Sequence, residues 1–204
     1  DPLGRLQRTN MFVTTTTFGS TQRAEGAARL VRGVHDRVSG TAPDGRPYRA
    51  TDPRLLLWVH VGLTDSMLVA AQHYHRRPVD ADGYVAEMAV IGEAVGVVDP
   101  PRSEAALAEV LDGFRADVGG EHARDVAGFL QRPSGALPPA AMPAYLVLAR
   151  AATDLLPPWA HPVLGTPDRV PALRRLDSLA CTSLLRTLHV VLGPRSASVE
   201  AAYA

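Results

Sequence analysis

The sequence predicts an all-α protein: a single-domain helical bundle of about seven helices. Three observations predict this class. Apolar residues recur at spacings of three and four along most of the 204 residues. Residues that start helices, such as Asp-Pro, Ser and Thr, alternate with the Gly and Pro that end them. Hydrophobic residues make up 46% of the chain, enough for a buried core. We expect the helical domain to cover residues 1–194 and a flexible tail to cover 195–204.

The first two helices are predicted near the start of the chain. Asp1-Pro2 is a capping residue followed by proline, and the helix it starts should fade in the threonines of 14–17, whose branched side chains are poor helix formers. A second helix is expected from Thr21 to about Val38, before Gly40. His35 falls on its apolar stripe, which comprises Ala24, Ala27, Ala28, Val31, Val34 and Val38.

A loop and a long helix follow. Residues 40–51 are rich in Pro and Gly, and their Asp44-Gly45 step can form a hairpin turn between two very short strands. Asp52-Pro53 starts a helix that runs to about Tyr74, and we expect Asp52 to pair with Arg49. His60 falls on the apolar face of this helix, with Leu56, Val59, Leu63, Met67, Ala70 and Tyr74.

The rest of the domain is also predicted to be helical. Further helices are expected over 82–95, from Ser103 to about 114, and over 121–130, 144–156 and 171–192. In the helix that follows Ser103, the residues expected inward are Leu107, Val110, Leu111 and Phe114. Cys181, on the last helix, is predicted to pack in the core.

Composition excludes several classes of function. The net charge is zero and the pI is near 7.2, which argues against a nucleic-acid partner. All 21 positive residues are Arg, so no catalytic lysine is available. The single cysteine excludes an intrachain disulfide. The sequence shows no signal peptide, and its apolar stretch 55–63 is too short to cross a bilayer. We therefore expect a cytoplasmic protein without a transmembrane segment, and a homo-oligomer stays an open alternative.

Two sets of residues can carry chemistry. His35 and His60 each lie on an apolar stripe, and a neutral imidazole is a good axial ligand for haem iron. Arg5, Arg8 and Thr9 share one helix face and can neutralise a haem propionate or polarise dioxygen. The residues leave two other interpretations open, in which the histidines are hydrogen-bonded core residues and the arginines form a solvated surface turn. Motifs of nucleotide-binding loops, HExxH zinc sites and di-iron bundles are absent.

Four segments in this order resemble a known family. They are DPLGRLQRT at 1–9, VHDRVSG at 34–40, DGRPYRATDP at 44–53 and LLLWVH at 55–60. Together they are similar to the MpaB/rubber-oxygenase (latex clearing protein) family, strongly over residues 1 to about 100. The resemblance implies an all-α fold that holds haem b, in which relatives cleave carbon-carbon double bonds of isoprenoid chains with dioxygen.

The resemblance also assigns site residues. An Arg-x-x-Lys-Thr pattern of the family falls on Arg5, Arg8 and Thr9, which we expect to be catalytic. The axial iron ligand falls most plausibly on His35, and His60 is a second cofactor-binding residue. Arg8 stands where the rubber oxygenases carry lysine, which puts any mechanism that needs a titratable amine in doubt. The family's helices before this block are expected to be absent from this sequence.

The function implied by the resemblance is that of a haem b-dependent oxygenase. It would act with dioxygen on a small apolar substrate of the alkene or isoprenoid type. The alternative is a helical protein that binds haem or a small hydrophobic ligand without oxygenase activity.

Overall fold

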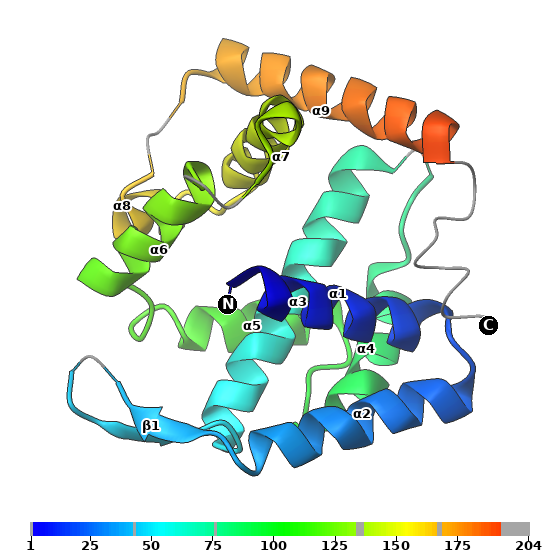
Figure 1. Cartoon of the computed structure of the whole chain (residues 1–204), viewed down its shortest axis with the longest axis vertical. Helices are drawn as coiled ribbons and strands as arrows, with labels where there is room; N and C mark the ends of the chain where they lie inside the picture. Colours follow the sequence, from blue (N-terminus) through cyan, green and yellow to red (C-terminus); the bar gives the residue numbers. More distant parts are fainter. Residues whose placement is uncertain (1, 43, 76, 134–136, 167–168, 193–204) are drawn as a thin grey trace. The chain divides into compact units, whose positions relative to one another are not determined.

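A computed structural model describes residues 2–42, 44–75, 77–133, 137–166 and 169–192 (Figure 1). Helices account for 72% of the chain, and the sheet has two short strands, so the all-α class is confirmed. Residue contacts divide the chain into two compact units, one that ends at Phe114 and one that begins at Arg115, and we call them unit 1 and unit 2. Each unit is described by itself.

Unit 1 holds five α-helices and the sheet among its described residues. Its elements are α1 (Pro2–Phe18), α2 (Thr21–His35), β1 (Ser39–Thr41), β2 (Pro47–Arg49), α3 (Pro53–Tyr74), α4 (Ala81–Val95) and α5 (Glu104–Gly113). The described elements of unit 2 are α6 (Glu121–Gln131), the 3-10 helix η1 (Pro139–Ala141), α7 (Met142–Asp154), α8 (Ala160–Leu164) and α9 (Pro171–Leu192).

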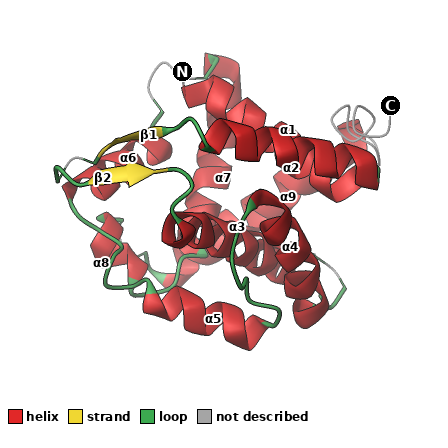
Figure 2. Ribbon diagram, turned by 90° about the horizontal axis from the view of Figure 1, so that it is seen from below, coloured by secondary structure: helices red, strands yellow, loops and turns green. Residues whose placement is uncertain are grey.

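Helices α1 and α2 form an antiparallel pair joined by a tight turn (Figures 1 and 2). Glycine is required at position 19, because a Cβ there would lie 2.5 Å from the carbonyl oxygen of Thr15. The predicted fading of α1 at residues 14–17 is wrong. The helix continues to Phe18, and the Thr16 hydroxyl donates to the carbonyls of Phe12 and Val13 at 3.0 and 3.1 Å.

Helix α2 ends three residues earlier than expected, at His35. The chain leaves the helix because the carbonyl of Val38 accepts from the backbone N–H of Ala50 at 2.9 Å, where the hairpin of β1 and β2 begins. The strands pair antiparallel with Ser39 opposite Arg49, so the predicted pair of short strands is confirmed. Val34 and Val38, which were expected on the buried stripe, are exposed.

The core of unit 1 lies where α3, α4 and α5 meet. Its fully or nearly buried members are Val61, Leu68, Val85, Leu107 and Phe114. The rings of Trp58 and Phe114 pack 5.2 Å apart. The inward residues predicted for α5 are confirmed, since Val110 and Leu111 also pack against this cluster.

The buried face of α3 differs from the predicted one. His60 is buried as expected, together with Val61, Thr64 and Leu68, but Val59 is 66% exposed. Helix α3 packs against both α4 and α5, and its buried face runs through Val61, Thr64 and Leu68, so Val59 and Met67 of the predicted face lie outside it. By length and composition alone, α3 is the one helix among the described residues that could cross a membrane. Its apolar window is 22% buried inside the structure, so the expected absence of a transmembrane segment stays a prediction.

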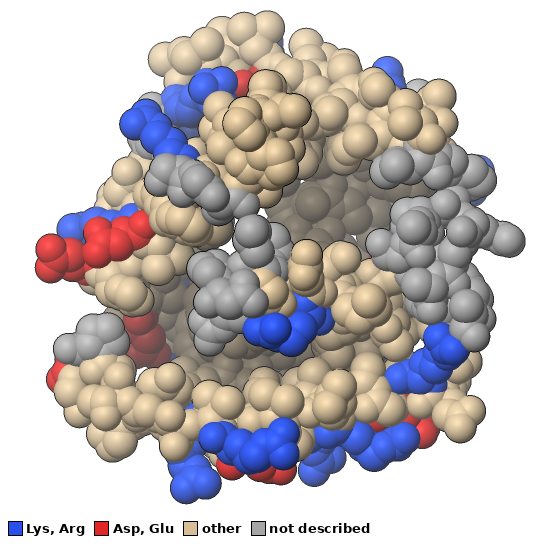
Figure 3. Space-filling model, viewed as in Figure 1, with Lys and Arg blue, Asp and Glu red and all other residues tan. Residues whose placement is uncertain are grey.

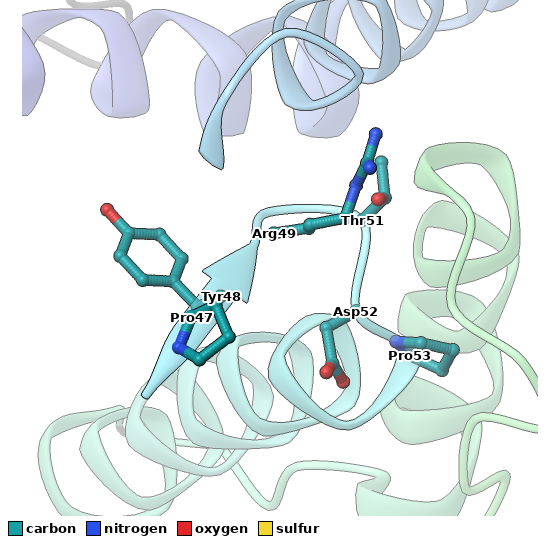
Figure 4. A pocket seen from close by; sticks show the side chains of 6 residues that line it. All are labelled: Pro47, Tyr48, Arg49, Thr51, Asp52 and Pro53. Carbon is teal, nitrogen blue, oxygen red and sulfur yellow. The ribbon is translucent and has the colours of Figure 1, made fainter. Parts of the chain in front are cut away.

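Helix starts follow the predicted capping chemistry with small shifts. Ser103 caps α5 as expected, and Asp80 caps α4, which begins at Ala81, one residue before the expected start. Asp52 caps α3 and accepts from the backbone N–H groups of Arg54 and Leu55 at 2.8 and 3.4 Å. The expected ion pair of Asp52 with Arg49 is wrong, since the two side chains extend in opposite directions (Figure 4); the residues are joined by a backbone bond from Asp52 N–H to the carbonyl of Arg49 at 3.0 Å.

Unit 2 is built around α7, which packs against α6 and α9. Cys181 of α9 is 3% exposed, so its predicted core position is confirmed. Arg169 forms ion pairs with Asp154 of α7 and Asp177 of α9, and all three side chains are at least four-fifths buried. The short helix α8 lies in a segment for which the sequence analysis predicted no helix.

Candidate functional site

His60 lies in the interior of unit 1, where α3 faces α4. The residue is 7% exposed, and its Nε2 atom is buried without a hydrogen-bond partner. Burial lowers the pKa of His60, because the charged imidazolium loses its hydration there. At neutral pH the ring is therefore uncharged, the form that offers a lone pair to a metal or a proton donor.

The backbone of α4 lies directly against this ring. At Gly92, a built Cβ would lie 2.8 Å from Cε1, 2.9 Å from Nδ1 and 3.1 Å from Nε2 of His60. No ordinary Cβ contact is that short, so the imidazole occupies the space that a side chain at position 92 would fill. Sequence reasoning did not single out Gly92. A glycine in the last turn of an apolar helical stretch, ahead of the Gly96 that ends the helix, was the signal that could have found it.

His35 lies at the last position of α2. Its side chain is half-buried, and its Nδ1 atom is buried without a hydrogen-bond partner. Helix α4 packs against α2 as well as against α3, so one helix contacts both histidine-bearing helices. The solvent-facing side of α2 carries exposed arginines, including Arg29, which pairs with Glu25 at 3.7 Å (Figure 3).

Arg5, Arg8 and Thr9 lie in the first half of α1. Arg8 and Thr9 are exposed, and the side chain of Arg5 lies outside the described residues. The antiparallel pairing of α1 with α2 sets this half of α1 beside the end of α2 that carries His35 (Figure 1). The structure thus brings the backbone of this half of α1 and His35 to the same end of one helix pair.

An open groove of about 430 Å³ lies where the hairpin meets α3 (Figure 4). Its lining residues are Pro47, Tyr48, Arg49, Thr51, Asp52 and Pro53. Neither predicted histidine lines it, and the side chains of Arg49 and Asp52 extend in opposite directions. The groove is therefore separate from the predicted cofactor residues.

A metal ion held by protein groups alone needs several ligands in one place. Over the described ranges, no group of three or more His, Cys, Asp or Glu side chains is placed to hold one. A haem iron needs one or two axial side chains, because the porphyrin supplies the other ligands. Two histidines of unit 1 have a buried ring nitrogen without a partner, the kind of atom that binds a haem iron, and His161 of unit 2 has one as well.

These observations define a helical protein with unsatisfied imidazoles on two helices that pack against a third. The family described as ER-bound oxygenase mpaB/B'/rubber oxygenase, catalytic domain, matches residues 1–190. The chain belongs to this family, so the resemblance noted in the sequence is confirmed, and an oxygenase-like, oxidoreductase function follows. The match extends over both units. No curated protein and no solved structure matches the chain.

Proposed function

We propose that this protein is a haem b-dependent oxygenase that acts with dioxygen on an apolar alkene or isoprenoid-type substrate. One observation supports it beyond family membership: three histidines of the described residues have a buried ring nitrogen without a partner, and two of them, His35 at Nδ1 and His60 at Nε2, are the predicted cofactor residues. Leaving a buried polar atom unsatisfied costs about 1–3 kcal/mol. A ligand that takes up these nitrogens would remove that cost.

In this proposal each residue has a distinct role. His35 is the iron ligand and His60 is a second residue of the cofactor pocket. Bound haem supplies the iron chemistry that activates dioxygen. His60 stays neutral in its buried position and presents an uncharged nitrogen to the pocket.

The basic face of α1 supplies positive charge that would neutralise a haem propionate or polarise dioxygen. Arginine keeps its proton at all physiological pH values, so Arg5 and Arg8 stabilise negative charge and do not transfer protons. Thr9 contributes a hydroxyl from the same helix face. Because Arg8 replaces a lysine of the rubber oxygenases, the proposal assigns no amine chemistry to this position.

The test is an absorption spectrum of protein produced with haem supplied, paired with oxygen consumption on an apolar alkene. Wild type should show a Soret band, and His35→Ala should lose it. His60→Ala should keep haem with an altered spectrum. His189→Ala, at an exposed position of α9, is the matched control and should behave as wild type.

The second candidate function is a haem-binding protein without oxygenase activity. The unpartnered nitrogens of both His35 and His60 favour it, because an iron held by both of these residues would have no position left for dioxygen. A low-spin spectrum that changes in both histidine variants, without oxygen consumption, would select this alternative. Absence of any Soret band after haem addition would refute both.

A further inference from the structure

We infer that Gly92 is a positioning residue for His60: because it lacks a side chain, α4 lies against the imidazole and fixes the direction of its Nε2 atom. The inference rests on the proposed function in one respect, namely that His60 belongs to the cofactor pocket. The contact itself is independent of any cofactor.

The need for glycine at position 92 is one of space. A Cβ would meet three atoms of the His60 ring at 2.8–3.1 Å, and under 3.0 Å something must shift. Backbone conformation gives no reason for glycine here, since Gly92 is helical and is not among the glycines with positive φ. Glycine inside a helix is also about 1 kcal/mol less favourable than alanine. Glycine at position 92 therefore weakens the helix slightly and allows α4 to lie close to the ring.

The backbone at Gly92 is held in place from its own helix. Its carbonyl accepts from the N–H of Val97 at 2.9 Å, in the turn that ends α4 at Gly96 with φ 101°. On the other side of the contact, Val61 and Thr64 flank His60 and are fully buried. A Cβ at position 92 would thus displace the imidazole, since it would lie under 3.0 Å from two atoms of the ring and the neighbours of His60 on α3 are buried.

Gly62 offers a matched control. It is also a helical glycine, it lies two residues from His60 on α3, and a Cβ there would meet no atom within 4 Å. Gly62→Ala and Gly92→Ala therefore make the same chemical change, and they differ in whether the new methyl group meets His60.

The experiment introduces each alanine into wild type and into His60→Ala. In protein without haem, the His60 ring resonances and their pH titration are followed by NMR. In protein with haem, the Soret position and the haem dissociation rate are measured. Gly92→Ala should shift the His60 resonances and speed haem dissociation at least about tenfold, the scale expected when a site group is displaced by a fraction of an ångström. Gly62→Ala should change neither.

The His60→Ala background separates positioning from a general structural effect. There the space of the imidazole is vacant, so Gly92→Ala should no longer affect haem dissociation, and the double variant should fold even if Gly92→Ala alone does not. Equal effects of Gly92→Ala in both backgrounds, or unchanged His60 resonances, would overturn the inference. If wild type takes up no haem, the proposed function fails, while the NMR comparison still decides the role of Gly92.

Discussion

The buried imidazole of His60 should make the stability of unit 1 depend on pH. Burial lowers the pKa of His60 below the 6.5 of a free histidine, so between these two values the unfolded chain binds a proton that the folded chain does not. Stability should be complete above pH 6.5 and should fall as the pH drops toward the folded pKa. One proton changes the free energy of unfolding by at most about 1.4 kcal/mol per pH unit.

The assay is urea unfolding followed by circular dichroism at intervals from pH 7.5 to 5.0, for wild type and His60→Gln. The difference between the two curves isolates His60. If unfolding is driven by heat instead of urea, a loss of about 1 kcal/mol lowers the thermal midpoint by roughly 4 °C for a unit of this size. Burial raises the pKa values of Asp65 and Asp154, so their protonation acts in the opposite direction, and because both residues are present in both proteins they cancel in the difference. Parallel curves for the two proteins over this range would refute the account of His60.

Three further predictions concern packing and capping. Leu107→Ala should destabilise unit 1 by about 2–5 kcal/mol in denaturant unfolding, because this side chain is 1% exposed, whereas Leu130→Ala, at a 54% exposed position, should cost far less. Arg169→Met should cost about 3 kcal/mol by the same measurement, since it leaves two buried carboxylates unpaired; Arg102→Met, whose ion pair is half exposed, should cost less than about 1 kcal/mol. Asp52→Ala should cost about 1 kcal/mol through loss of the α3 cap, and an unchanged midpoint would show that the cap contributes nothing.

Helical periodicity and capping residues were enough to predict the class and the order of the elements. They located α3 through Asp52-Pro53 and the end of α4 at Gly96, because both signals act within a few residues of the chain. They failed at α1, where the intrinsic preference of the threonines was outweighed by the packing of α1 against α2, and Thr14 is buried. They also predicted part of the buried face of α3 incorrectly, since that face depends on which helices pack against α3.

The histidines of the candidate site could be predicted from the sequence, whereas the residues that pack against them could not. His60 was identified because it replaces an apolar residue on a stripe, and His35 because it lies in a family-like motif. Gly92 was not identified, because its meaning depends on a ring that lies 32 positions earlier in the chain. The same holds for the Arg169 ion pairs, whose two carboxylates come from different helices.

Cys181 gives unit 2 a built-in chemical reporter. The thiol is the only one in the chain, and it is nearly inaccessible on α9. A thiol-specific reagent can label it only when α9 separates from its neighbours or the unit unfolds. The labelling rate under native conditions therefore measures how often this part of the molecule opens, with no substitution or attached dye, and a background free of other reactive sulfhydryls makes each labelling event traceable to one position.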